Sequence, residues 1–178
     1  MEQALAAPAT DVPSDADAAF EALYRSSRDD LYAYVAGLLR DRGAAEDVTA
    51  QAFERAFRKR RRFDPRRGTM RAWVFGIARN AALDELRRRK RQVELPDEAE
   101  DTTSPTPEES ADVALHRAAL RTAMAQLTPR ERELIALKFF AGLSNPEIAT
   151  VVGISESNAG TRVHRVIEKL REACDEAH

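Results

Sequence analysis

The sequence predicts an all-α protein made of two small helical domains joined by an acidic flexible linker. Three observations support this prediction: apolar residues recur every three or four positions in two separate blocks, Gly and Pro interrupt these blocks at few points, and charge differs sharply between segments. Of the 178 residues, 33% are charged and 43% hydrophobic, which is typical of a globular chain. We expect a disordered tail at 1–19, a first domain at 20–91, a linker at 92–112 and a second domain at 113–178.

Charge marks the same segments. Residues 20–91 hold 19 Lys and Arg against 10 Asp and Glu, a profile typical of a domain that binds a polyanion. Residues 92–112 hold eight acidic and no basic residues, with three prolines among Ser and Thr, which indicates a solvated linker. Residues 113–178 are nearly neutral and regain apolar periodicity. The four acids and two prolines of residues 1–19 indicate an acidic, frayed tail.

Composition and motifs argue against several classes of protein. The chain has no apolar run of about 18 residues and no secretory signal, so we expect a cytoplasmic protein without membrane insertion. Its one cysteine and three separated histidines offer neither a disulfide nor a zinc cage, and no phosphate-binding glycine loop or nucleophile motif occurs. We expect no metal and no cofactor. An enzyme is the weakest function considered, because His116, His164 and Cys174 form no catalytic grouping.

The first domain begins with two helical stretches. Apolar residues from Phe20 to Leu39 recur at spacings of three and four, which predicts helices with one buried face that end at Gly43. A second helix is expected from about Ala44, with Phe57 among the residues of its inner stripe. Its outer stripe is polar and consists of Asp47, Gln51, Glu54 and Arg58. This pattern fits a solvated surface, and a docking surface for a partner is the alternative.

The third predicted helix mixes apolar, basic and aromatic residues. FDPRRGTM breaks the helical pattern with Pro65 and Gly68, and RAWVFGIARNAALDELRRRK resumes it. Side chains suited to phosphates, to base stacking and to a base edge lie along this helix: Arg71, Arg79, Arg87, Arg88, Trp73, Phe75 and Asn80. Singly, a Trp at helical spacing is more often a core residue, and a mid-helix Asn more often makes a local contact. Their grouping in a basic domain favours nucleic-acid binding.

The second domain contains a predicted helix-turn-helix. Two capping boxes, Thr128 with Glu131 and Ser144 with Glu147, mark the starts of two helices that close at glycines 142 and 153. The short second helix, a Gly-bearing turn and a final helix from Ser155 form the motif whose last helix enters the DNA major groove. Side chains that reach base edges or phosphates lie near the start of that last helix: Asn158, Thr161, Arg162, His164 and Arg165. A purely structural helical hairpin is the alternative.

Together these stretches resemble bacterial sigma factors of the extracytoplasmic function (ECF) group, the smallest members of the sigma-70 family. AEDVTAQAFERAFRKRRRFDP resembles the segment that grips the clamp helices of the largest RNA polymerase subunit, and RAWVFGIARNAALDELRRRKR resembles the segment that melts and reads the minus-ten promoter element. LTPRERELIALKFFAGLSNPEIATVVGISESNAGTRVHRVIEKLR resembles the domain that reads the minus-thirty-five element. The resemblance covers roughly residues 20–175 and implies a sigma factor.

The resemblance implies three sets of contact residues. Core RNA polymerase is contacted by Asp47, Gln51 and Glu54. The minus-ten element, as duplex and as melted non-template strand, is contacted by Arg71, Trp73, Arg79, Asn80, Arg87 and Arg88, and Asn80 matches the residue that helps capture a flipped base. The minus-thirty-five element is contacted by Arg130, Asn158, Thr161, Arg162, His164 and Arg165.

Two positions depart from the family pattern. Ala50 stands where many members have Gln, so one polar contact is missing or is supplied by Gln51. Gly160 stands where many members carry Lys or Arg, which removes one contact to the minus-thirty-five element and permits a close approach of the backbone to DNA. Replacing Gly160 with Lys is therefore expected to broaden or shift promoter preference.

Two other functions stay open at this point. A stand-alone DNA-binding regulator would dimerise on a palindromic site, and an adaptor or decoy would bind polymerase without selecting start sites. Anti-sigma proteins are common in the family, and the sequence does not decide whether one restrains this chain. The acidic linker falls where the family's linker threads toward the polymerase active site and RNA exit channel. We expect it to oppose DNA binding by the free protein.

Overall fold

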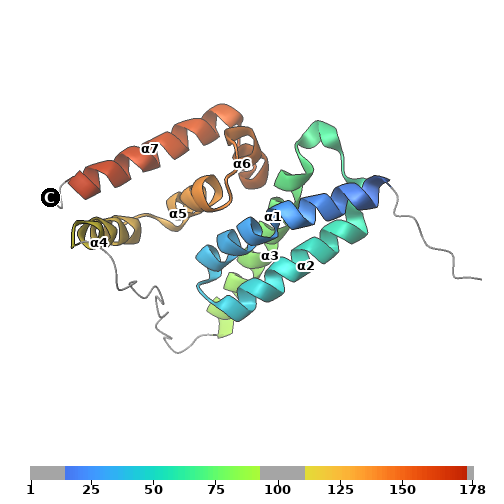
Figure 1. Ribbon diagram of the computed structural model, residues 1–178, viewed down its shortest axis with the longest axis horizontal. Helices are drawn as coiled ribbons and strands as arrows, with labels where there is room; N and C mark the ends of the chain where they lie inside the picture. The colour runs from blue at the N-terminus through green and yellow to red at the C-terminus, as the bar shows by residue number, and fades with distance from the viewer. Residues whose placement is uncertain (1–14, 93–110, 176–178) are drawn as a thin grey trace, which may run out of the picture.

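The computed structural model describes residues 15–92 and 111–175, and all the regular structure in these ranges is helical (Figure 1). The first domain consists of α1 (Asp15–Leu39), α2 (Arg42–Lys59) and α3 (Met70–Gln92), with the single turns η1 (Arg60–Arg62) and η2 (Pro65–Arg67) between α2 and α3. The second domain consists of α4 (Ala111–Ala125), α5 (Pro129–Ile135), η3 (Ala136–Phe140), α6 (Asn145–Val152) and α7 (Glu156–Asp175). The predicted fold class, two small helical domains, is confirmed.

The domain borders differ from the predicted ones by a few residues. Helix α1 begins at Asp15, so residues 15–19 belong to the first domain and not to the tail. Asp15 and Asp17 favour a helix start because they lie at the positive end of the helix dipole, and Asp17 also pairs with Arg60 at 2.7 Å. The linker predicted at 92–112 loses Gln92 to α3 and its last two residues to α4. The rest of the predicted linker and tail lie outside the described residues.

Helices α1 and α2 are separated at Arg40 and Asp41, and not at Gly43 as the sequence suggested. Arg40 takes the left-handed conformation with φ 51°, which reverses the chain without a glycine. The Asp41 carboxylate then accepts a hydrogen bond of 3.0 Å from the N–H of Ala44 and caps α2. Gly43 therefore lies in the first turn of α2.

The core of the first domain is aromatic. Tyr34 of α1 and Phe75 of α3 are fully buried, with ring centroids 5.8 Å apart. The prediction that Phe75 stacks on bases is therefore wrong, because α1 covers its ring. Phe57, predicted on the inner stripe of α2, is 42% exposed. Its ring packs at the periphery, against the edge of Phe20 on one side and under the Arg60 guanidinium on the other.

The predicted caps of the second domain are present. Thr128 Oγ1 accepts from the N–H of Glu131 at 3.3 Å, and the Glu131 carboxylate accepts from the N–H of Thr128 at 2.7 Å. Helix α5 continues into the π-helical turn η3, and the chain turns at residue 142 with φ 60°. The backbone N–H and the hydroxyl of Ser144 both donate to the Glu147 carboxylate at the start of α6.

The helix-turn-helix is confirmed in α6, a three-residue turn and α7. Gly153 ends α6 in the left-handed conformation with φ 76°, and Ser155 Oγ accepts from the N–H of Asn158 at the start of α7. Ala149 of α6 is buried. The buried residues of both domains form one hydrophobic cluster, in which α6 packs on α3 and η3 packs on α1.

Candidate functional site

The polar stripe predicted on α2 lies on the surface of the first domain. Asp47, Gln51, Glu54 and Arg58 are all exposed, and Arg58 Nη1 contacts Glu54 Oε1 at 3.4 Å along the same helix. Asp47 and Gln51 make no recorded polar contact within the described residues, and both line a groove of about 470 Å³ between α2 and α3. Two side chains with free hydrogen-bonding groups beside a groove are suited to docking a protein partner.

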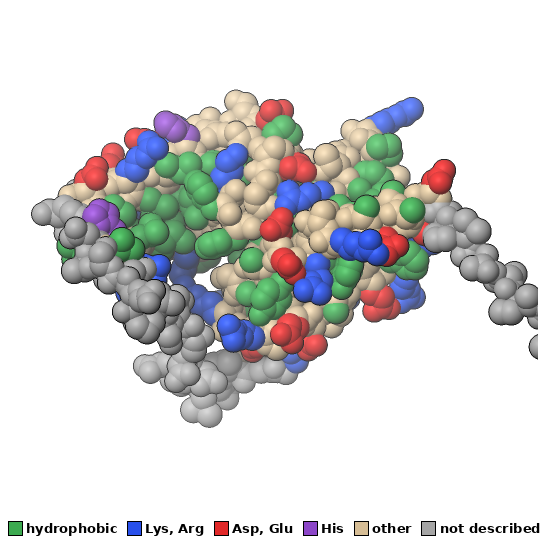
Figure 2. Space-filling view, in the orientation of Figure 1, with side chains coloured by type: hydrophobic (Ala, Val, Ile, Leu, Met, Phe, Trp, Pro, Cys, Tyr) green, Lys and Arg blue, Asp and Glu red, His purple; other side chains and the backbone are tan. Residues whose placement is uncertain are grey.

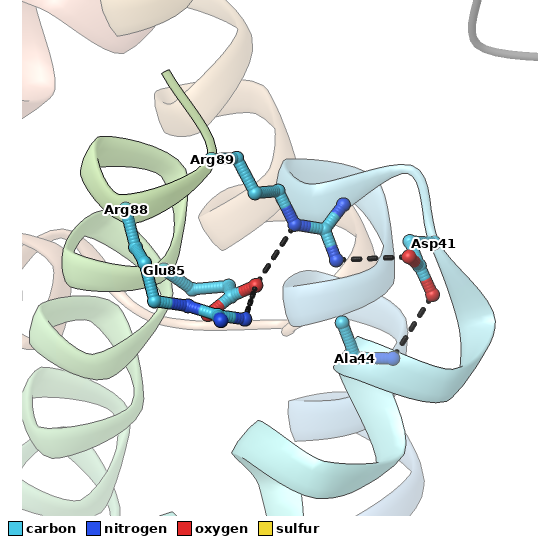
Figure 3. A network of polar contacts seen from close by, with 5 residues as sticks. All are labelled: Asp41, Ala44, Glu85, Arg88 and Arg89. Carbon is cyan, nitrogen blue, oxygen red and sulfur yellow. Dashed lines mark hydrogen bonds and ion pairs between the residues drawn. The ribbon is translucent and has the colours of Figure 1, made fainter. Parts of the chain in front are cut away.

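A network of charged residues, three of which line that groove, joins α3 to α2 (Figure 3). Glu85 of α3 accepts from Arg88 at 2.7 and 2.8 Å and from Arg89 at 2.9 Å, and Arg89 also donates to Asp41 at the start of α2, at 2.8 Å. The hydrogen bonds from Arg88 and then Arg89 lower the pKa of the Glu85 carboxyl to about 2. The N–H of Ala44 and then Arg89 lower the pKa of Asp41. The network ties the last turns of α3 to the first turn of α2.

Four residues of the predicted minus-ten set lie on the accessible surface of α3. Asn80 is exposed and has no recorded polar contact within the described residues. Trp73 is half-buried against the ring of Phe63, with centroids 5.6 Å apart. Arg87 and Arg88 are exposed and pair within their own helix, with Asp84 and Glu85. The Arg87–Asp84 pair is exposed on both sides and contributes little, so a phosphate can displace it at low cost.

The other two residues of that set, Arg71 and Arg79, point toward the second domain. Arg79 contacts both carboxylate oxygens of Glu133 on α5, at 2.6 and 3.1 Å, and this hydrogen bonding raises the pKa of Arg79. Arg71 donates to Asp30 at 2.8 Å and to the carbonyl oxygen of Ala141. The sequence placed all six residues on one nucleic-acid surface, and the structure places these two in the domain interface.

The predicted recognition surface of the second domain is accessible. Asn158, Thr161, Arg162, His164 and Arg165 are exposed on one side of α7, and Arg130 is exposed at the start of α5. Arg162 Nε donates to Asn158 Oδ1 at 2.8 Å, and the Thr161 hydroxyl donates to the Ser157 carbonyl at 2.9 Å. The opposite side of α7 is buried through Ala159, Val163 and Val166. This arrangement leaves the polar side of α7 open to a DNA groove.

Gly160 does not face that open side. A Cβ atom built at Gly160 would lie 3.2 Å from Nδ2 of Asn145 in α6. The glycine thus lets α7 approach α6 within the helix-turn-helix, which differs from the approach to DNA that the sequence suggested. Its effect is on the packing of the motif.

Sequence reasoning missed an apolar groove in the second domain. The groove has a volume of about 450 Å³ and lies between α4, η3 and α7, lined by Leu120, Met124, Phe139, Phe140, Ile167 and Leu170. Phe139 and Phe140 are 61% and 53% exposed. Hydrophobic side chains gather on this part of the surface in Figure 2. The available signal in the sequence was the pair of adjacent phenylalanines, Phe139 and Phe140.

None of the helices in residues 15–92 and 111–175 is long and apolar enough to cross a membrane. The same ranges contain no group of three or more His, Cys, Asp or Glu side chains placed to hold a metal ion.

The fold and these surfaces define a two-domain helical protein that contains a helix-turn-helix. Residues 23–92 match the family model of sigma-70 region 2, and residues 107–170 match that of sigma-70 region 4. The chain is 34% identical over 164 residues to the ECF RNA polymerase sigma factor SigL of Mycobacterium tuberculosis, spanning 89% of this chain and 92% of SigL. It is 38% identical over 162 residues to the RNA polymerase sigma factor CarQ of Myxococcus xanthus, spanning 89% and 90%. The chain belongs to the ECF group of the sigma-70 family of RNA polymerase sigma factors.

Solved structures share the fold. CnrH, solved in complex with the cytosolic domain of CnrY, superposes with a TM-score of 0.61 at 26% identity over 89% of each chain. The sigma factor RpoE of Bartonella quintana, solved with the anti-sigma factor NepR, superposes with a TM-score of 0.68 at 24% identity, over 88% of this chain and 97% of RpoE. Both likenesses extend across the two helical domains.

Proposed function

We propose that this chain binds bacterial core RNA polymerase in the cytoplasm and directs initiation at promoters with two elements. The first domain docks through Asp47, Gln51 and Glu54 and reads and melts the minus-ten element. The second domain reads the minus-thirty-five element with the open side of α7. The observation that supports this most strongly is the presence of three separate exposed polar surfaces, on α2, around Asn80 and on α7, in one small chain.

The proposed mechanism consists of binding steps and makes no covalent bond. Asn80 offers an unpaired amide to an extruded base, and trapping that base offsets an unstacking cost of a few kcal/mol. The arginines of α3 and α7 neutralise phosphates and supply an affinity that weakens as salt rises. The spacing between the two elements then follows from the positions of the domains on polymerase.

Promoter-specific transcription by the reconstituted enzyme tests the proposal. The purified chain is added to core polymerase on a genomic library, and run-off transcripts are mapped to their start sites. Transcripts that require the chain and share two upstream elements support the sigma function. Binding to polymerase without such transcripts would favour an adaptor, and binding to palindromic DNA as a dimer would favour a stand-alone regulator.

Two variants separate the proposed roles of the first domain. Asp47→Ala should weaken polymerase binding more than promoter opening, because Asp47 lies on the α2 stripe. Asn80→Ala should impair opening more than polymerase binding. Glu46→Ala is the matched control, since Glu46 is an exposed acid next to Asp47 and outside the stripe. Equal losses in both assays for both variants would contradict this division of roles.

The sequence did not decide whether an anti-sigma protein restrains this chain. We propose that such a protein binds the second domain. The apolar groove at Phe139 and Phe140 supports this, because an exposed apolar patch is typical of a protein contact and offers nothing to a phosphate. Phe139→Ser should weaken capture of such a protein while leaving DNA binding by α7 intact, as measured by pull-down and by DNA titration.

A further inference from the structure

A basic groove lies where the end of α1, one side of α3 and the start of α5 meet. The groove has a volume of about 550 Å³, and the only acidic residue in its lining is Glu133. Five arginines from both domains line it: Arg40, Arg79, Arg87, Arg130 and Arg132. The groove is therefore strongly positive and is suited to an anion.

Most of this charge is not used within the protein. Both carboxylate oxygens of Glu133 accept from Arg79, at 2.6 and 3.1 Å, so these two charges offset one another. Arg87 pairs with Asp84 at 2.7 Å, and both side chains are so exposed that the pair contributes little. The side chains of Arg40, Arg130 and Arg132 make no recorded polar contact within the described part of the chain. Three arginines are thus available to a ligand, and Arg87 is a fourth.

The backbone at Arg40 is unusual. Its φ of 51° makes it the one non-glycine residue with a positive φ among the described residues. This left-handed conformation brings Cβ close to the backbone, and residues held in it gather at functional sites. Glycine would make the same turn at a lower cost. An arginine in this conformation indicates that its guanidinium has a use that the turn itself does not require.

The remaining lining suits a small molecule. Leu38, Leu83 and Leu86 are half-buried and give the groove an apolar wall. Its volume lies in the range of about 300 to 1,000 Å³ that is typical of small-molecule sites. No aromatic residue lines the groove, whereas proteins that hold single-stranded nucleic acid stack its bases on aromatic side chains. The groove therefore favours a compact anion with one apolar part over a nucleic-acid strand.

We propose that this groove binds a nucleoside triphosphate, with the phosphates on Arg40, Arg130 and Arg132 and the base against the leucines. A guanidinium offers two parallel N–H donors to a phosphate, and three or four of them match the charge of a triphosphate. Apart from the arginines and Glu133, no polar side chain lines the groove to distinguish one base from another. ATP and GTP should therefore bind alike. The inference goes beyond the proposed function and does not rest on it.

The contacts set the size of the expected effects. Losing a hydrogen bond to a charged group weakens binding about tenfold. Removal of Arg40 or of Arg132 should therefore weaken binding about tenfold, and removal of both about a hundredfold, if the two act independently. Burying about 40 Å² of a base against the leucines makes ATP bind about fivefold tighter than inorganic triphosphate.

Calorimetric titration of the full chain with ATP, GTP and inorganic triphosphate tests the proposal. The salt concentration is about 0.15 M, which screens weak attraction to exposed charges. The variants are Arg40→Gly and Arg132→Gln, because neither residue belongs to the sets proposed to contact DNA or polymerase. Arg40→Gly also relieves the left-handed backbone, so its urea midpoint should be equal to or above that of the wild type. A loss of binding in this variant then cannot come from unfolding.

Matched variants separate the groove from net charge. Arg66→Gln and Arg121→Gln each remove one exposed arginine that lies outside the groove, one in each domain. Arg132→Lys keeps the charge and loses the two parallel donors. We expect one ATP per chain, full affinity in Arg66→Gln and Arg121→Gln, about tenfold weaker binding in Arg40→Gly and Arg132→Gln, and a smaller loss in Arg132→Lys.

Three results would overturn the inference. The first is the absence of saturable ATP and GTP binding up to about 1 mM. The second is an equal loss in Arg66→Gln and Arg40→Gly, which would show attraction to net charge without a site. The third is equal affinity for inorganic triphosphate and ATP, which would show that the base has no place in the groove. Failure of the proposed sigma function would not affect this test, because the titration contains neither polymerase nor DNA.

Discussion

Replacing Gly160 with Ala is expected to stabilise the second domain. Glycine inside a helix costs about 1 kcal/mol relative to alanine. The new Cβ would meet Nδ2 of Asn145 at 3.2 Å, so that amide must move by a few tenths of an ångström. The amide is the end of a flexible side chain, and its recorded contact, from Lys138 Nζ at 3.4 Å, is weak. Moving it costs about 0.5 kcal/mol, the low end for a side chain displaced from its rotamer. The net gain is therefore about 0.5 kcal/mol.

Urea denaturation followed by helical circular dichroism measures this gain. The midpoint should rise with an unchanged slope, and thermal unfolding of a domain of this size should shift upward by about 2 to 4 °C. A loss of more than about 1 kcal/mol would refute the reasoning, because it would show that Asn145 cannot yield and that the contact between α6 and α7 is rigid. In the Gly160→Lys variant, the Cβ atom of the lysine would also lie beside Asn145. We therefore expect mapped start sites to be unchanged, contrary to the expectation from the sequence.

Three further predictions concern packing, capping and pH. Phe75→Ala should cost about 3 to 5 kcal/mol in urea unfolding, because the ring is fully buried against Tyr34; a loss below about 1 kcal/mol would contradict its place in the core. Thr128→Ala should cost about 1 kcal/mol by removing the cap of α5, measured in the same way, whereas Thr122→Ala, on the exposed side of α4, serves as the control. The pKa of Glu85, lowered to about 2 by Arg88 and Arg89, gives stability that is present above the ordinary carboxyl pKa of 4.5 and is lost as the pH falls toward 2. Arg88→Gln should raise that pKa in a carbon-13 NMR titration, and an unchanged pKa would rule out the pairing seen in Figure 3.

The exposed residues of the candidate site were predictable from the sequence wherever they lie on one side of a single helix. The spacing of Asp47, Gln51 and Glu54 places them on one side of α2 in any fold that buries the apolar side, and the structure leaves them exposed. The same holds for the open side of α7. Spacing along α3 could not decide which of Trp73 and Phe75 is buried in the core. Spacing shows that they face different directions around α3, but the burial of Phe75 depends on Tyr34 of another helix.

The sequence by itself determined the helices, their caps and the division into two domains, because these depend on residues within a few positions of each other. The capping box of Thr128 with Glu131 and the left-handed conformation of Gly153 are local in this sense. Only the tertiary structure decided which charged side chains are available. Arg79 looks free on its own helix, and its partner Glu133 lies 54 residues away. An ion pair across a domain border depends on how two surfaces meet, and no local pattern in the chain specifies that meeting.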